Sequence, residues 1–211
     1  MLFMAYDRTA MLNILRPGVT RVMTPLGRVL ARLGISPDTI TVIGTLGVAV
    51  SALVFYPLGH LFLGTVVITV FVLADMLDGV LARMTGTGSR WGAFLDSTLD
   101  RLADASIFSG LILHFVLKDD PEIVLAGVAL FCLVAGSLVS YAKARAEGLG
   151  MTANVGIAER GERLVVALVA AGLSGLGVPY VLAIGLWLLA AASAVTVVQR
   201  MVHVYRQAVE R

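Results

Sequence analysis

Four aspartates stand close together in the middle of a strongly apolar chain: Asp75, Asp78, Asp96 and Asp100. Ionisable side chains in such sequence are costly to bury and usually have a function. Because several negative charges at short range repel one another, positive charge must lie among them. Either bound divalent cations supply it, or arginines pair with the aspartates across helices; the local arginines are Arg83, Arg90 and Arg101.

The residue types favour bound metal over ion pairs made for structure alone. The aspartates outnumber the local arginines, and desolvating so many ions for structure would be unfavourable. Carboxylate oxygen is the ligand that hard cations such as Mg²⁺ and Mn²⁺ prefer, whereas zinc favours the Cys and His that are missing from this stretch. We therefore predict a magnesium or manganese site.

The spacing of the aspartates predicts how helices would present them. Asp75 and Asp78 are three residues apart, and Asp96 and Asp100 are four apart, so each pair shares one helix face. A short turn over 84–91 joins the two helices. We expect this turn to bring the two acidic faces side by side at one depth.

The residues after Asp78 suit a phosphate ester. Gly79 leaves the backbone bare, so that a ligand can approach closely. Arg83 follows one helical turn later, where its guanidinium could hold a phosphate through two hydrogen bonds. Two metal ions among the carboxylates could activate an attacking hydroxyl and stabilise a leaving oxygen. The pattern predicts phosphoryl-group chemistry.

The elements that position these residues are predicted to be membrane helices. Of 211 residues, 58% are hydrophobic and 14% charged, against roughly 45–50% apolar and about 25% charged in a soluble domain. A spanning helix needs about 20 mostly apolar residues, and six segments qualify. Pro121 and Pro179 are expected in the first turns of the fourth and sixth. The predicted spans are 39–57, 61–84, 92–117, 121–147, 157–176 and 179–206.

Residues 1–37 are predicted to lie along the membrane interface. They combine an apolar helical face with several arginines, which suits an amphipathic helix in the headgroup layer. The Ser36-Pro37-Asp38-Thr39 run is a helix-start signal. The expected fold is an all-α integral membrane protein, with an interfacial segment over 1–37 and a six-helix membrane domain over 38–211.

The basic residues predict the orientation. Of the sixteen Lys and Arg, Lys118 alone falls at one end of the predicted bundle, and the others fall at the end that holds the aspartates and both termini. Positive charge marks the cytoplasmic side, so the acidic site is expected to face the cytoplasm at the cell membrane. No nucleic-acid partner is expected. A small multi-pass transporter is disfavoured, because polar residues crowd at one end instead of spreading across the membrane.

The acidic stretch resembles the signature of the CDP-alcohol phosphotransferase family, with no departure in residue or spacing: Asp75-x2-Asp78-Gly79-x2-Ala82-Arg83-x8-Gly92-x3-Asp96-x3-Asp100. Members are similar six-helix membrane enzymes, usually homodimers, that transfer a CDP-linked phosphatidyl group to an alcohol and release CMP.

The resemblance implies roles for individual residues. The four aspartates would hold two Mg²⁺ ions, and Asp100 would also be the base that deprotonates the attacking hydroxyl. The CDP-diacylglycerol contacts would be Gly79, Arg83 and Ser89, with Asp38, Thr39, Ile40 and Thr41 closing over the nucleotide.

The acceptor alcohol is predicted from a basic stretch over 140–163. Its lysine and arginines, with Arg200 nearby, favour an anionic acceptor. The runs SYAKARAE (140–147), IAERGER (157–163) and VQR (198–200) resemble the phosphatidylinositol phosphate synthase branch of the family in actinobacteria. That likeness implies inositol phosphate as acceptor; the alternative is glycerol phosphate, as in phosphatidylglycerophosphate synthases. The residues implied to hold its phosphate are Ser140, Lys143, Arg163 and Arg200.

Overall fold

The computed structural model of the chain describes the backbone of residues 36–85 and 89–209, and the side chains of 36–75 and 89–209. Nearly all of the predicted interfacial segment over 1–37 lies outside these residues. Every regular element in the described part is a helix. The helices are α2 (Pro37–Phe55), α3 (Leu61–Thr85), α4 (Arg90–Val116), α5 (Ile123–Gly148), α6 (Arg160–Gly175) and α7 (Val181–Val209).

Each predicted span coincides with one helix, but three helices start two or three residues later than predicted. α6 begins at Arg160, whereas its span was predicted from 157. α5 begins at Ile123 instead of Pro121, because the preceding turn is closed by a hydrogen bond from the Glu122 N–H to the Phe115 carbonyl (3.0 Å). α7 begins at Val181 instead of Pro179. Tyr180 there has a φ of 59°, a left-handed conformation that a right-handed helix cannot include.

The helices identify a membrane protein. α2, α5 and α7 are each long and apolar enough to cross a bilayer. The apolar part of α3 that the structure describes, Leu61–Asp75, is shorter, and α6 has 16 residues. Length and composition thus support spanning for three helices, and six crossings remain a prediction.

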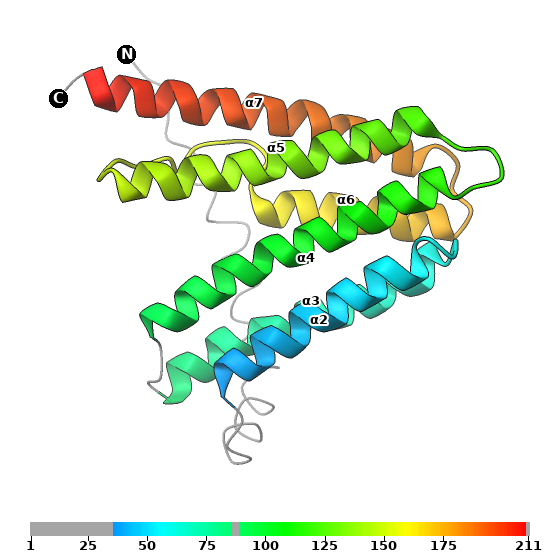
Figure 1. Cartoon of the computed structure of the whole chain (residues 1–211), viewed down its shortest axis with the longest axis horizontal. Helices are drawn as coiled ribbons and strands as arrows, with labels where there is room; N and C mark the ends of the chain where they lie inside the picture. The colour runs from blue at the N-terminus through cyan, green and yellow to red at the C-terminus, as the bar shows by residue number, and fades with distance from the viewer. Residues whose placement is uncertain (1–35, 86–88, 210–211) are drawn as a thin grey trace.

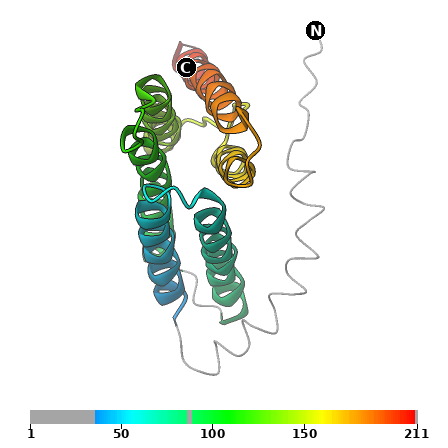
Figure 2. The same cartoon turned by 90° about the vertical axis from the view of Figure 1, so that its right-hand side faces the viewer.

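The helices pack so that α4 and α6 join two halves of the bundle. α2 packs against α3 and α4, while α7 packs against α5 and α6; α4 contacts α5, and α6 contacts α3. In Figure 2, α2 and α3 lie in the lower part of the view, and α6 and α7 lie above them. In Figure 1 the turns over 56–60, 117–122 and 176–180 lie on the right, so the starts of α2 and α4 lie with the end of α3 on the left. We call this left-hand end the site end.

Small residues set the distance between helices at the opposite end. Gly110 of α4 lies directly against the Ala52 carbonyl of α2, with no room for a Cβ between them. Gly175 of α6 lies equally close to the Phe62 backbone of α3. Glycine permits such close approach of helix backbones in membrane bundles. These contacts fix α4 and α6 relative to α2 and α3, and thereby the geometry at the site end.

Candidate active site

Three of the predicted metal ligands meet at the site end. Asp75 on α3 and Asp96 and Asp100 on α4 each offer a carboxylate oxygen, and these atoms all lie within 4.8 Å of one another. Such a set of oxygen donors fits a hard divalent cation, which takes carboxylate ligands from several elements. Asp78 lies one turn further along α3, where side chains are outside the described residues.

Asp75 lies against a bare stretch of the α2 backbone. A Cβ added at Gly44 would be 3.2 Å from the Asp75 Oδ1 and 3.4 Å from the Asp75 Cβ. α2 therefore forms one wall of the acidic cluster, and Gly44 lets the carboxylate sit at that wall.

Two predicted donor-binding residues meet where α2 and α4 begin. Ser89 caps α4, its Oγ accepting a hydrogen bond from the Gly92 N–H (2.9 Å). A Cβ at Gly92 would lie 3.3 Å from both the Ser89 Oγ and the Asp38 Oδ1. Gly92 thus leaves space that the Asp38 and Ser89 side chains border. Backbone N–H groups at a helix start also favour bound phosphate.

The remaining predicted donor contacts are placed as follows. Thr39 is exposed, and its Oγ1 lies 2.8 Å from the Ser36 Oγ; the Thr41 Oγ1 donates to the Pro37 carbonyl (3.2 Å). Ile40 is half-buried in the same turn of α2. The side chain of Arg83 and the surroundings of Gly79 lie outside the described residues.

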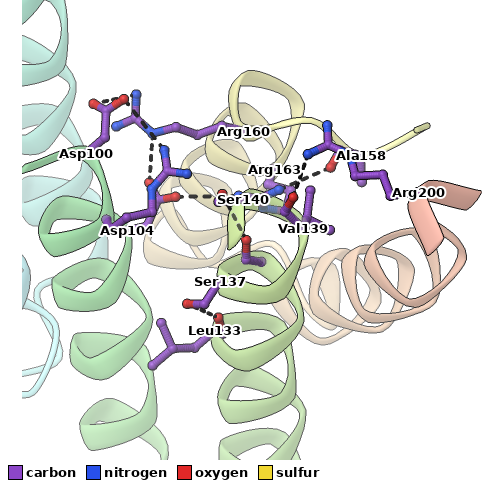
Figure 3. A network of polar contacts seen from close by, with 12 residues as sticks. Asp100, Asp104, Leu133, Ser137, Val139, Ser140, Ala158, Arg160, Arg163 and Arg200 are labelled. Atoms are coloured by element: carbon purple, nitrogen blue, oxygen red, sulfur yellow. Dashed lines mark hydrogen bonds and ion pairs between the residues drawn. The ribbon is translucent and has the colours of Figure 1, made fainter. Parts of the chain in front are cut away.

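An arginine from α6 joins the acidic cluster (Figure 3). The Arg160 Nη1 lies 2.7 Å from the Asp100 Oδ1, and its Nε donates to the Asp104 Oδ1 at 3.2 Å. Arg163 contacts the same Asp104 through Nη2 (3.5 Å), and Arg101 lies 3.6 Å from the Asp100 Oδ2. Asp100 and Asp104 thereby connect α4 to the start of α6.

The two predicted acceptor arginines on α6 and α7 are buried. Arg163 is 3% exposed and donates to the Ala158 carbonyl (3.1 Å), with its guanidinium against Gly136 of α5. Arg200 is 4% exposed and donates to the carbonyls of Val155 and Val139. Both side chains therefore tie the loop between α5 and α6 to the bundle (Figure 3).

The other two predicted acceptor residues lie on α5. The Ser140 Oγ donates to the Gly136 carbonyl (3.1 Å), in the helical turn that Arg163 and Arg200 contact. Lys143 is half-exposed and pairs with Glu147 at 3.9 Å. The structure thus gathers Ser140, Arg163 and Arg200 around one stretch of α5, whereas Lys143 points to a partner further along the helix.

Asp104 and Arg160 are site residues that the sequence did not single out. Asp104 follows Asp100 at the spacing that separates Asp96 from Asp100, so the three share one face of α4. That periodicity was a usable signal for Asp104. Nothing in the sequence pairs Arg160 with either aspartate, because the contacts join residues 56 positions apart for Asp104 and 60 for Asp100.

A family model for CDP-alcohol phosphatidyltransferase matches residues 34–205, which is most of the chain. The chain belongs to this family. Because members of this family are enzymes, the match favours an enzyme over the transporter that the sequence left as an alternative.

Named relatives agree with that assignment. The chain is 52% identical over 209 residues to a phosphatidylinositol phosphate synthase of Streptomyces avermitilis, covering 95% of this chain and 85% of the relative. The Mycobacterium tuberculosis phosphatidylinositol phosphate synthase with CDP-DAG bound has a TM-score of 0.84 and 43% identity, over 88% of this chain and 94% of that one. Its complex with manganese and citrate has a TM-score of 0.83 and 43% identity, over 87% and 88% of the two chains. A divalent metal in a relative of this fold accords with the acidic cluster found here.

Proposed function

We propose that this enzyme transfers the phosphatidyl group of CDP-diacylglycerol to inositol phosphate, giving phosphatidylinositol phosphate and CMP. One observation carries the proposal: the carboxylate oxygens of Asp75, Asp96 and Asp100 cluster together, and Asp100 also pairs with Arg160, one of the basic residues of α6. A carboxylate cluster of this kind suits a metal-bound pyrophosphate, and the adjoining positive charge suits an anionic alcohol. The phosphatidylinositol phosphate synthases that are similar over most of the chain support the same acceptor.

The proposed metal ligands are Asp75, Asp78, Asp96 and Asp100, holding two Mg²⁺ ions, with Mn²⁺ as an alternative. When bound, such ions neutralise developing charge on the pyrophosphate and acidify the attacking hydroxyl.

The chain's own residues would handle the donor and the proton. Asp38 to Thr41, Gly79, Arg83 and Ser89 bind and orient the CDP moiety. Asp100 accepts the proton of the acceptor hydroxyl while the hydroxyl oxygen forms a bond to the β-phosphorus of CDP-diacylglycerol. The bond from that phosphorus to the oxygen it shares with the α-phosphate breaks, and CMP leaves with both electrons of that bond. A positioned base of this kind contributes about 10²–10⁴-fold to rate.

The acceptor's phosphate would lie among Ser140, Lys143, Arg163 and Arg200. Ser140 lies in the 136–140 turn of α5, and both Arg163 and Arg200 contact this turn. Arg163 also contacts Asp104. A phosphate there would face the hydroxyl-activating carboxylate from the α5–α6 side. Inositol phosphate would then extend from these basic residues, which hold its phosphate, to Asp100, which takes the proton of its hydroxyl.

The proposed setting is the cytoplasmic face of the cell membrane, with six crossings, an interfacial helix over 1–37 and a homodimeric assembly. Among the described residues Lys118 lies in the 117–122 turn, whereas Arg90, Lys143, Arg160 and Arg206 lie toward the site end. This distribution supports a cytoplasmic site end. A position at the interface would let a lipid-anchored donor meet a water-soluble acceptor.

The acceptor is tested with purified protein, CDP-diacylglycerol and Mg²⁺. Labelled inositol phosphate and labelled glycerol phosphate are offered in parallel, and lipid-soluble label is measured. We expect incorporation from inositol phosphate; incorporation from glycerol phosphate alone would transfer the assignment to a phosphatidylglycerophosphate synthase. Asp100→Asn should abolish CMP release while CDP-diacylglycerol binding persists, and continued turnover by this variant would remove Asp100 as the base.

A further inference from the structure

Arg160 is placed to hold two carboxylates of α4 at once. Its Nη1 lies 2.7 Å from the Asp100 Oδ1, and its Nε lies 3.2 Å from the Asp104 Oδ1. The two carboxylates are four residues apart, so both face α6 from one side of α4. A planar guanidinium with donors in fixed directions can bridge such a pair, whereas a lysine ammonium offers a single nitrogen.

Asp104 is in turn held from the buried side. Arg163 lies 3.5 Å from its Oδ2, and Arg163 itself is 3% exposed and bonded to the Ala158 carbonyl. The side chains of Arg160, Asp100 and Asp104 are 30%, 17% and 15% exposed. Charges sheltered to this degree are screened less by salt than fully exposed charges, so their mutual attraction is retained. A continuous series of contacts thus runs from Arg163 through Asp104 and Arg160 to Asp100 (Figure 3).

Charge neutralisation alone does not account for Arg160. Arg101 already lies 3.6 Å from the other oxygen of Asp100, on the same helix. What Arg160 adds is a short contact from a different helix, directed at Oδ1 and braced by Asp104. Its contribution is therefore the direction in which the Asp100 carboxylate points.

We propose that Arg160 is a positioning residue that orients the Asp100 carboxylate toward the acceptor hydroxyl, and that Asp104 holds Arg160 in the required place. The inference rests on the proposed function, in which Asp100 takes the acceptor's proton. It also links the arginine proposed to bind the acceptor's phosphate, Arg163, to that base. Binding of the acceptor's phosphate at Arg163 and orientation of the Asp100 carboxylate then depend on the same network of contacts.

The experiment uses the full-length enzyme in detergent, with kcat and KM measured separately for CDP-diacylglycerol and inositol phosphate. Arg160→Ala should lower kcat by about 10- to 100-fold, the loss typical when a partner that orients a metal-site residue is removed. The KM for CDP-diacylglycerol should stay within twofold of the original value. Added guanidinium ion should restore part of the kcat, because the truncated site is partly open to solvent. Arg206→Ala, at an exposed position near the end of α7, controls for the loss of one arginine.

Further variants separate orientation from charge and from folding. Arg160→Lys should keep the thermal unfolding temperature but recover little kcat, because one nitrogen cannot bridge Asp100 and Asp104. Asp104→Asn should lower kcat similarly, and the double variant Arg160→Ala/Asp104→Asn should be no slower than Arg160→Ala. A wild-type kcat in Arg160→Lys, absence of rescue by guanidinium, or losses that multiply in the double variant would each overturn the proposal. If Asp100→Asn remains active, the proposed function is wrong in assigning Asp100 as the base. If Asp100→Asn is inactive while Arg160→Ala has the original kcat, only the positioning role of Arg160 is wrong.

Discussion

The close approach of α2 to the acidic cluster predicts a graded response to side chains at position 44. In Gly44→Ala the new Cβ would lie 3.2 Å from the Asp75 Oδ1 and 3.4 Å from the Asp75 Cβ. Both distances are at or below ordinary contact, so the carboxylate must shift by a few tenths of an ångström. Misplacement by about 1 Å can cost about 10²-fold in rate. We expect Gly44→Ala to lower kcat by about 3- to 10-fold, and the bulkier Gly44→Val to lower it by about 100-fold or more.

The assay measures kcat together with the Mg²⁺ concentration that gives half-maximal activity. Displacement of Asp75 should raise this concentration in the same order, Gly44→Val above Gly44→Ala. Thermal unfolding in detergent supplies the folding check, because replacing a helical glycine by alanine favours the helix by about 0.5–1 kcal/mol. Gly127→Ala on α5 is the matched control, since an added Cβ there has no neighbour within 4 Å. Unchanged kcat and metal dependence in both position-44 variants would refute the placement of Asp75 against α2.

Three further predictions concern packing, the α5–α6 loop and the metal. Gly110→Val should destabilise the protein by about 1–3 kcal/mol in detergent unfolding, because its Cβ would overlap the Ala52 carbonyl; wild-type stability would contradict that crossing. Thr196→Val removes the hydroxyl that accepts from the Ile157 and Ala158 N–H groups at 3.1 and 3.0 Å. It should cost about 1–3 kcal/mol and raise the KM for inositol phosphate, whereas an unchanged KM would separate the loop from acceptor binding. EDTA should abolish CMP release, Mg²⁺ or Mn²⁺ should restore it, and turnover that persists in EDTA would exclude a metal requirement.

Much of the helical architecture could be predicted because membrane helices follow from local composition. Apolar runs bounded by charge or proline predicted all six helices within a few residues. Three helices, α5, α6 and α7, start two or three residues later than predicted, and for α5 and α7 the cause is local. Pro121 and Pro179 favour a first helical turn, but the tertiary turn at Glu122 and the left-handed Tyr180 displaced both starts by two residues.

The acidic cluster could also be read from the chain, because its members are close in sequence. The three- and four-residue spacings put each aspartate pair on one helix face. The short turn keeps the end of α3 near the start of α4, and α2 packs against both helices. Asp75, Asp96 and Asp100 meet accordingly. The signature stretch alone therefore determined the family and the type of chemistry.

The tertiary structure alone decided which distant residues complete the site. The contact of Arg160 with Asp100 and Asp104 joins segments about sixty residues apart, and no local periodicity encodes such a contact. Likewise, Gly44 faces Asp75 because α2 crosses α3 at that level, and the acceptor arginines are buried because the α5–α6 loop folds back over them. Spacing along a helix determines which side chains share a face. Helix packing determines what that face meets.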